Sequence, residues 1–423
     1  MRSLRVDDLS FAEYVKPGDL VVWGQACAEP QTLTETLVKQ RSMIGRFRGF
    51  IGATFSKTFA AEHADYIQFV GTGAIGSARR LSQAGVVDIV PFHITSCDRA
   101  FERGWLTCDV ALVQVAPPDE NGVFSVGLAS DWIRTAVRQA RVVIAEVNSQ
   151  VPRTSCAEPL TEDDIDICVY TNRPLLEVPS VVPGEGDRAI ARHALEYVPD
   201  RAVIQVGIGS VPDALVSMLG SRRGLGLHSG MIGDSVVDLI ERGVINNEYK
   251  EIDRGVSVTG QLLGTRRLYD YCHGNPAVRL MPVGHTHDIG VLSQLSNFVA
   301  LNSAVEVDLT GQVNAEAVGE SYIGAVGGQV DFARGALRSP GGRSIIALPS
   351  TTADGKSRIV AALQGPVTTP RSDVDLVVTE QGAADLRAKP FGERIAALIK
   401  IAHPSHREML ERQVAVAGCG HRR

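Results

Sequence analysis

The strongest constraint on the fold is a unit of strand, glycine-containing loop and helix that occurs twice along the chain. Residues 19–23 (DLVVW) and 202–206 (AVIQV) read as apolar strands, and each is followed by a loop with glycine and then by a helix with an apolar stripe. Proline is favoured at the first helical position, so equal proline spacing marks equivalent helix starts. The prolines are thirteen positions apart in both units, Pro17 and Pro30 in one and Pro199 and Pro212 in the other.

A second internal correspondence supports a duplication. Residues 111–125 and 300–314 share an Ala-Leu pair followed by an Asp-x-x-Gly turn, which aligns Asp119 and Gly122 with Asp308 and Gly311. The two correspondences have nearly the same separation. They predict an α/β fold in which two related α/β domains pack around an inter-domain cleft.

The turn-rich segment 179–187 (PSVVPGEGD) is the predicted linker between the two domains. It places an N-terminal domain at residues 1–185 and a C-terminal domain at residues 186–423. Apolar runs in the C-terminal domain predict further strands at residues 256–259, 344–348 and 374–378, and VVTEQGAADL (377–386) reads as another strand, turn and helix.

The stretch LGLHSGMIGD (225–234) also reads as a strand, a turn and a helix. We expect a strand ending at Leu227, a turn formed by His228, Ser229 and Gly230, and a helix beginning at Met231. In open α/β sheets, ligands bind at the carboxyl ends of strands. His228 is therefore a candidate for facing a site, with a buried structural histidine as the alternative.

Composition excludes several classes of protein. The net charge of −6 lacks the basic excess typical of nucleic-acid binders. The sequence has no apolar run long enough for a membrane span, and its acidic N-terminus is unlike a signal peptide. Seven scattered cysteines form no CxxC pair and no zinc-type spacing. These features predict a cytoplasmic protein with reduced thiols, no bound metal and neither nucleic acid nor membrane as partner.

Two glycine-rich segments are candidates for ligand contact. GIGSVP (207–212) places the backbone N–H groups of Gly207 and Gly209 at a helix start, where they could bind a phosphate or a carbonyl oxygen. In GAVGGQVDFARGA (324–336), closely spaced glycines allow the main chain to lie against a flat or anionic ligand. Arg334 could pair with a phosphate or carboxylate. The alternatives are a plain strand-to-helix turn in the first segment and a turn with an Asp331–Arg334 salt bridge in the second.

The sequence resembles the acetyl-CoA hydrolase/transferase branch of the class I CoA-transferases, in particular 4-hydroxybutyrate CoA-transferase-like enzymes. The resemblance runs almost from end to end and is specific because the motifs occur together. They are CAEP (27–30), PPDENGVFSVG (117–127), AEVNSQVPRT (145–154), GIGSVPDAL (207–215), LHSGMIGD to GVINN (227–247), GAVGGQVDFARGA (324–336), IALPSTT (346–352), VVTEQGAADL (377–386) and IAHPSHREML (401–410).

The resemblance implies an enzyme that moves CoA between a short-chain acyl-CoA and a small carboxylic acid in two half-reactions. A glutamate attacks the thioester, an acyl-glutamyl anhydride gives a glutamyl-CoA thioester, and an acceptor carboxylate reverses the sequence. Acyl-CoA is a substrate, and no cofactor is bound permanently. A homodimer or larger homo-oligomer is expected. The implied CoA-binding residues are Gly324, Gly327, Gly328, Gln329 and Arg334, and the implied oxyanion turns are those at Gly207 to Gly209 and at Ser229 and Gly230.

At the central turn the sequence departs from the family pattern. Members similar to 4-hydroxybutyrate CoA-transferase read His-Ser-Glu-Met there, and that glutamate is the nucleophile, whereas this chain reads His228-Ser229-Gly230-Met231. Three interpretations follow. In the first, another carboxylate replaces the missing glutamate as nucleophile; we select Glu29, with His228 as a second candidate catalytic residue at the cleft. In the second, water or the acceptor attacks the thioester directly, which gives a hydrolase or a one-step transfer. In the third, the chain binds CoA without catalysis.

Overall fold

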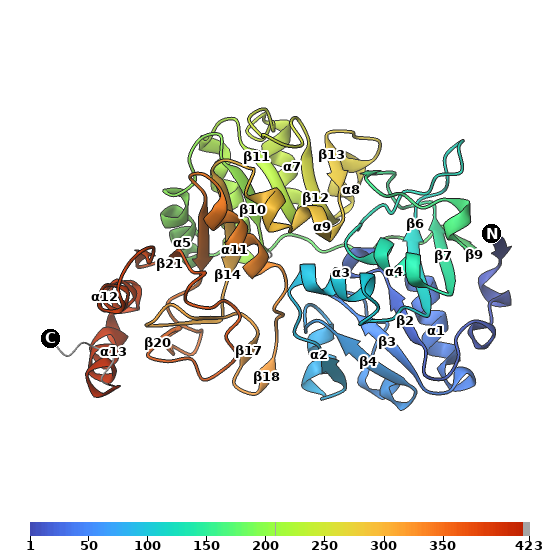
Figure 1. Cartoon of the computed structure of the whole chain (residues 1–423), viewed down its shortest axis with the longest axis horizontal. Coiled ribbons are helices and arrows are strands. Elements are labelled where there is room, and N and C mark those ends of the chain that lie inside the picture. Colours follow the sequence, from blue (N-terminus) through green and yellow to red (C-terminus); the bar gives the residue numbers. More distant parts are fainter. Residues whose placement is uncertain (208, 418–423) are drawn as a thin grey trace.

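The structure is a computed structural model that describes residues 1–207 and 209–417, and it shows an elongated molecule built around two large sheets (Figure 1). The first sheet has eight parallel strands, which are in spatial order β1 (Arg2–Leu4), β9 (Ile167–Thr171), β7 (Val142–Asn148), β6 (Val110–Val115), β2 (Leu20–Trp23), β3 (Phe47–Ile51), β4 (Ile67–Gly71) and β5 (Val87–Ile89).

The second sheet has nine strands and is parallel except for its β22–β21 pair. Its spatial order is β22 (Gly382–Asp385), β21 (Leu376–Thr379), β19 (Arg343–Ala347), β14 (Phe298–Ser303), β10 (Val203–Val206), β11 (Gly226–Ile232), β12 (Ser257–Leu262), β13 (Val278–Leu280) and β8 (Ser155–Cys156). Because β8 comes from the first 185 residues, the N-terminal half of the chain supplies one edge of the second sheet.

Thirteen α-helices lie in the described part of the chain, together with two small sheets. The helices are α1 (Gln31–Ile44), α2 (Ala78–Gln83), α3 (Ile94–Glu102), α4 (Ile133–Gln139), α5 (Glu185–Leu195), α6 (Ser210–Met218), α7 (Asp234–Glu241), α8 (Arg266–Cys272), α9 (Val283–Thr286), α10 (Ile289–Leu292), α11 (Gln329–Arg338), α12 (Phe391–Ile401) and α13 (Pro404–Ala417). The small sheets consist of β16 (Val313–Asn314), β15 (Glu306–Asp308) and β20 (Ile359–Val360), and of β17 (Ala317–Val318) and β18 (Ser321–Tyr322).

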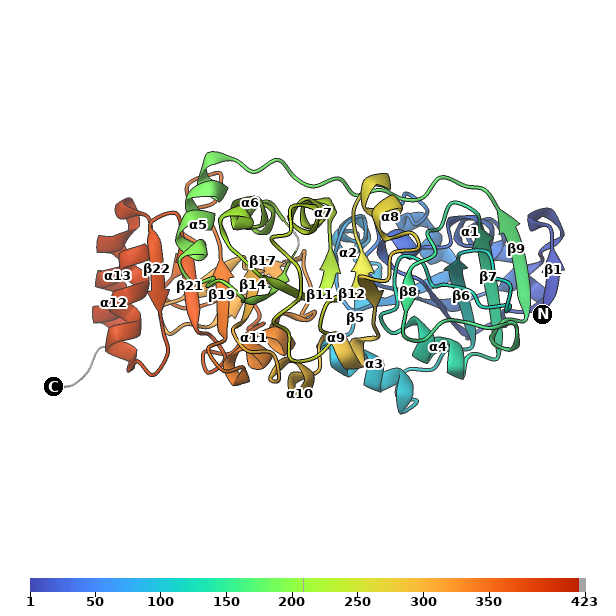
Figure 2. The ribbon, with the colours of Figure 1, turned by 90° about the horizontal axis from the view of Figure 1, so that it is seen from above.

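Helices cover both faces of the second sheet. Figure 2 shows α5, α6, α7 and α8 on one face and α9, α10 and α11 on the other, while the segment between β9 and α5 runs along the length of the molecule. One buried apolar cluster includes side chains from both sheets, such as Val113 of β6 and Leu262 of β12. The two halves therefore share a continuous core.

The two sheets repeat the same topology, as expected for a duplicated chain. The order β9-β7-β6-β2-β3-β4-β5 in the first sheet corresponds strand for strand, in chain order, to β21-β19-β14-β10-β11-β12-β13 in the second. In both sheets the order reverses beside the first of these strands, β2 or β10. Such a topological switch point is where open α/β sheets bind ligands, outside the carboxyl ends of the strands.

The predicted correspondence between the two Asp-x-x-Gly turns also holds in three dimensions. The Asp119 carboxylate accepts hydrogen bonds from the N–H groups of residues 121 and 123 at 3.0 and 2.9 Å. The Asp308 carboxylate accepts from those of residues 310 and 312 at 2.9 and 3.0 Å. The glycines of the two turns have φ of 74° and 96°, which explains why glycine occupies both positions.

Two local predictions are wrong. The predicted turn at residues 228–230 lies inside β11, which continues to Ile232, and the helix begins only at Asp234. The predicted final strand, turn and helix at 377–386 is an antiparallel hairpin of β21 and β22. In both cases tertiary pairing overrides local preference: His228 and Ser229 pair with Val258 and Thr259 of β12 in the sheet interior.

Among residues 1–207 and 209–417, none of the helices combines the length and the apolar composition that a bilayer crossing requires.

Candidate active site

The glycine-rich loop at residues 324–328 joins the two halves of the molecule. The N–H of Ala74, after β4, donates to the Gly324 carbonyl at 2.7 Å, and the N–H of Ile94 donates to the Gly327 carbonyl at 3.0 Å. Helix α11 begins at Gln329, so the ligand-binding loop predicted for 324–336 is shorter than expected. We call the contact region between the two halves the seam; it includes the segments around Ala74 and Ile94 and the loop at residues 324–328. The seam therefore contains the glycine-rich segment that was predicted from the sequence to contact a ligand.

A second contact across the seam is centred on a buried carboxylate. Asp131 is 4% exposed, and its Oδ2 accepts hydrogen bonds from Nε2 of Gln25 at 2.9 Å and from Nε2 of Gln261 at 3.2 Å. Gln25 follows β2 and Gln261 lies near the end of β12, so Asp131 links the carboxyl ends of strands in both sheets. Burial raises the pKa of Asp131 to about 6. Nothing in the sequence marked this residue, because its partners are distant in the chain.

The space beside Gly230 is filled by the imidazole ring of His287. A methyl group at residue 230 would lie 2.7 Å from Cε1 and 2.8 Å from Nε2 of His287. A methyl group at Gly328 would lie 2.5 Å from Cδ2 and Nε2 of the same ring. The flat group against which the glycine-rich loop packs is therefore a side chain of the protein itself. Glycine at both positions is a condition for His287 to occupy this site.

The His287 ring is held from the opposite side by Thr286. Nδ1 of His287 lies 2.8 Å from Oγ1 of Thr286, and that hydroxyl donates to the carbonyl of Pro282 at 3.3 Å. We assign the single hydroxyl proton to the Pro282 carbonyl, and with this assignment Oγ1 accepts from Nδ1–H and the lone pair is on Nε2. Nε2 has no hydrogen-bond partner among the described residues and faces Gly230 and Gly328. Burial lowers the pKa of His287 to about 3, so the ring is neutral near pH 7.

His287 was not predicted from the sequence, although HTHD (285–288) contained a signal. Two histidines at positions i and i+2 can contact alternate residues of a neighbouring strand, but only if their segment packs beside that strand. In the structure they do so: His285 lies against His228, with ring centroids 5.5 Å apart, and His287 lies against Gly230, two residues further along β11. A contact between residues this far apart cannot be read from local sequence.

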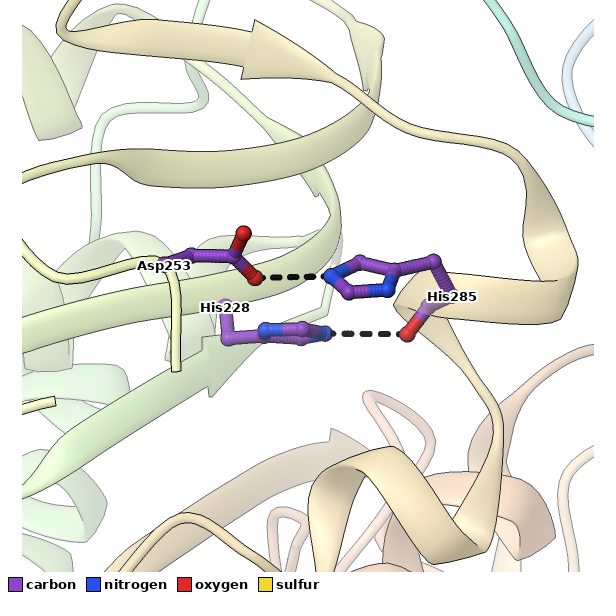
Figure 3. A group of neighbouring side chains, drawn as sticks. All are labelled: His228, Asp253 and His285. Atoms are coloured by element: carbon purple, nitrogen blue, oxygen red, sulfur yellow. Dashed lines mark hydrogen bonds and ion pairs between the residues drawn. The ribbon is translucent and has the colours of Figure 1, made fainter. Parts of the chain in front are cut away.

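His228, a predicted catalytic residue, lies in a buried group one layer below Gly230. Its Nε2 is 3.3 Å from the carbonyl of His285, while Nε2 of His285 is 2.7 Å from the Asp253 carboxylate (Figure 3). The three side chains offer metal-type ligand atoms within 4.8 Å of one another. However, the charge of the buried Lys250 acts on this group, which is unfavourable for a second cation. We interpret the group as an anchor for the segment that carries His287.

The anchor gives the fold a specific sensitivity to acid. Burial, and then the Lys250 and His285 charges, lower the pKa of His228 from 6.5 to about 3, while Asp253 opposes this shift. Between these values only the unfolded chain binds the proton, so the contribution of His228 to stability is present above pH 6.5 and is lost as the pH falls. We expect the stability difference between wild type and His228→Gln to shrink by about 2 kcal/mol from pH 7 to pH 5. Denaturant unfolding at both pH values measures it; a constant difference would contradict the assignment.

Of the predicted oxyanion residues, Gly207 and Gly209 follow β10, whereas Ser229 and Gly230 lie inside β11. The N–H of Gly207 donates to the Leu301 carbonyl at 3.0 Å, and the Ser229 hydroxyl donates to the Val206 carbonyl at 3.2 Å, so both donors already serve sheet pairing. Gly209 has φ of 127°, precedes α6 and lines a small cavity of about 80 Å³ together with Gly207 and Met231. Gly209 and Gly230 remain predicted oxyanion residues, and each could contribute only its backbone N–H.

The predicted CoA-binding residues lie on both sides of the start of α11. Gly327 has φ of 56° and open space around its Cα. The Gln329 amide donates to Oγ1 of Thr369 at 2.9 Å, and Arg334 pairs with the Asp373 carboxylate at 2.8 Å. The alternative salt bridge between Asp331 and Arg334 is not formed, because Asp331 accepts from the Thr95 hydroxyl across the seam at 2.8 Å.

Glu29 is buried within the N-terminal half. Its side chain is 1% exposed, and its two carboxylate oxygens accept hydrogen bonds from the hydroxyls of Thr34 and Thr54 at 2.9 and 3.0 Å. Burial raises its pKa, although neighbouring hydroxyls oppose the shift. A nucleophile must reach the thioester carbon with a free lone pair. The surroundings of Glu29 therefore favour a structural role over the catalytic role that we predicted.

Two parallel sheets of the same topology, with glycine-lined carboxyl ends meeting at a seam, define a duplicated α/β protein of the CoA-transferase type. Residues 7–198 match the acetyl-CoA hydrolase/transferase N-terminal domain, and residues 264–414 match the C-terminal domain of the same family. The chain belongs to the acetyl-CoA hydrolase/transferase family, as the sequence resemblance indicated.

Three similar proteins span nearly the whole chain. The 4-hydroxybutyrate coenzyme A transferase of Clostridium kluyveri is 39% identical over 405 residues, which is 92% of each chain. The crystal structure of RipA from Yersinia pestis superposes with a TM-score of 0.93 at 32% identity, covering 99% of this chain and 98% of RipA. A 4-hydroxybutyrate CoA-transferase structure from Porphyromonas gingivalis gives a TM-score of 0.85 at 31% identity, with 98% of both chains covered. The predicted α/β fold is thereby confirmed.

Proposed function

We propose that this protein moves CoA between a short-chain acyl-CoA and a free carboxylic acid. The observation that carries the proposal is the convergence of Gly230 of β11, the 324–328 loop and the loops after β4 and β5 at one seam. Such an edge can hold a thioester against backbone N–H groups and exclude water. Family membership and the full-length similarity to 4-hydroxybutyrate coenzyme A transferase support the same reaction class.

Acyl-CoA hydrolysis is the second candidate function. It is favoured by Gly230, because a chain without a carboxylate at this position lacks the group on which a glutamyl-CoA thioester would form. Water would then take the place of the acceptor acid. The two functions differ in the final acceptor and share the binding of acyl-CoA at the seam, with Gly327, Gln329 and Arg334 as the proposed CoA contacts. A homodimer or larger homo-oligomer remains part of the proposal, as does the absence of a permanently bound cofactor.

The test is a product analysis on purified protein. Acetyl-, butyryl- and succinyl-CoA are each incubated with and without a panel of short carboxylic acids, and all CoA species are quantified by mass spectrometry. The proposal predicts new acyl-CoA species that require the acceptor acid. Free CoA formed at the same rate without an acceptor would establish the hydrolase instead. Binding of CoA without any loss of thioester at high protein concentration would contradict both functions and leave a non-catalytic CoA-binding homologue.

A further inference from the structure

The imidazole of His287 is a buried group of the seam that has one nitrogen held by a neighbouring hydroxyl and the other beside the backbone of Gly230 in β11. Its Nδ1 is held by Thr286 at 2.8 Å, and its Nε2 faces the backbone of Gly230 and Gly328. His287 is 8% exposed, and both glycines beside it are partly exposed, so the ring forms part of the wall of the seam and is not enclosed in the core.

The surrounding sequence is arranged for this ring. Two glycines are required on one side, because a methyl group at residue 230 or 328 would approach the ring to 2.8 Å or less. Phe332 of α11 packs against the ring with a centroid distance of 4.4 Å. The hydrogen bond between Asp253 and His285 anchors α9, which leads directly into residue 287.

We propose that His287 is the nucleophile that accepts the acyl group from acyl-CoA. This inference rests on the proposed function and names the residue that performs its first step. Histidine can form covalent acyl intermediates, and a neutral imidazole attacks without first losing a proton. The burial that lowers the pKa of His287 to about 3 keeps the ring in this neutral form throughout the physiological pH range.

The reaction balances without a further reagent. The Nε2 lone pair attacks the thioester carbonyl carbon and the C–S bond breaks. The Nδ1 proton passes to the departing sulfur through solvent, so CoA leaves as a thiol and a neutral acyl-imidazole remains in a site whose burial disfavours a charged ring. An acceptor carboxylate attacks the acyl carbon, the C–N bond breaks, His287 takes a proton back from the CoA thiol, and a mixed anhydride forms beside neutral His287. The CoA thiolate then attacks the acceptor-derived carbonyl, which gives the new acyl-CoA and the donor acid. If water replaces the carboxylate, the donor acid and free CoA are the products.

The first experiment compares wild type, His287→Ala and the matched control His193→Ala, which changes a histidine of α5 outside the seam. We expect His287→Ala to lose both acyl exchange and thioester cleavage by about 1,000-fold or more in kcat, with CoA binding retained and the unfolding temperature lowered by the cavity that the lost ring leaves. His193→Ala should retain the wild-type rate. Because removal of the ring next to two glycines leaves a cavity, free imidazole should restore part of the activity of His287→Gly.

Thr286→Val tests the orientation of the ring separately. Thr286 is a positioning residue, so we expect kcat to fall about tenfold with KM unchanged. If the wild-type protein is active and His287→Ala keeps the full wild-type rate, the inference about His287 is overturned but the proposed function remains intact. Wild-type protein without activity on any acyl-CoA would overturn the proposed function itself. Failure of imidazole to rescue a folded, CoA-binding His287→Gly would also count against a nucleophilic ring.

Discussion

Replacing Gly230 by alanine is expected to reduce acyl-CoA turnover by about 100-fold. The added methyl carbon would stand 2.7 Å from Cε1 of His287, closer than carbon atoms approach one another, so the ring must move. The ring has little room, since Gly328 and Phe332 pack against it. A displacement of about 1 Å of a reacting group costs on the order of 100-fold in rate. Overpacking should also destabilise the fold by about 1–3 kcal/mol.

Steady-state kinetics and denaturant unfolding measure the two effects of Gly230→Ala. The control is Gly284→Ala: Gly284 lies in α9 close to His285, but an added methyl group meets nothing within 4 Å. We expect this variant to behave as wild type. In the double variant Gly230→Ala, His287→Ala the stability should recover, because the clash is removed, whereas the activity should not. Recovery of neither property would place the cause outside the contact between residues 230 and 287.

Replacing Asp131 by alanine is expected to destabilise the molecule by about 3 kcal/mol. The substitution removes the acceptor shared by Gln25 and Gln261, and each buried amide left without a partner costs about 1–3 kcal/mol. It also removes the acceptor for the N–H of Ile133 at 2.9 Å. Because the three side chains join the two halves, CoA turnover should fall together with stability.

Unfolding in denaturant, followed by tryptophan fluorescence, measures the loss for Asp131→Ala. The matched control is Asp163→Ala, which changes an exposed aspartate of the short helical turn at Glu162–Asp164 and should alter stability by less than about 0.5 kcal/mol. If Asp131→Ala also changes the free energy of unfolding by less than about 0.5 kcal/mol, the contact across the seam does not hold the halves together.

Much of the fold could be predicted because duplication leaves its traces in sequence. The proline spacing and the two Asp-x-x-Gly turns are local signals, and both correspond to equivalent elements in sheets of the same strand order. The turn predicted at His228 failed because polar and small residues usually mark loops. Here they lie inside a central strand, where Ser229 pairs with β10 and His228 bonds to a carbonyl of the segment after β13.

The candidate site was less predictable because its contacts join distant segments. The absence of a carboxylate at residue 230 is visible in the sequence, but the group that fills the space is not, since His287 reaches it only through the packing of α9 on β11. Glu29 was selected from its place after a strand, and its burial among threonine hydroxyls depends on a loop 25 residues away. Side-chain partners of this kind follow from tertiary structure alone.

A single-turnover experiment with an oxygen-18-labelled acceptor carboxylate tests the account most directly. Unlabelled protein is used in excess over acyl-CoA, so that each protein molecule reacts at most once. The released donor acid is then analysed by mass spectrometry. If His287 accepts the acyl group, the donor acid carries oxygen-18, because its new oxygen comes from the acceptor through the mixed anhydride. Direct attack of the acceptor on the thioester gives the same label, so the experiment is repeated with His287→Ala, which should lose the labelled product only if His287 takes part. If Glu29 or another carboxylate of the protein attacks, the new oxygen comes from the protein, and the donor acid of the first turnover is unlabelled. That second result, together with formation of the new acyl-CoA, would contradict the account.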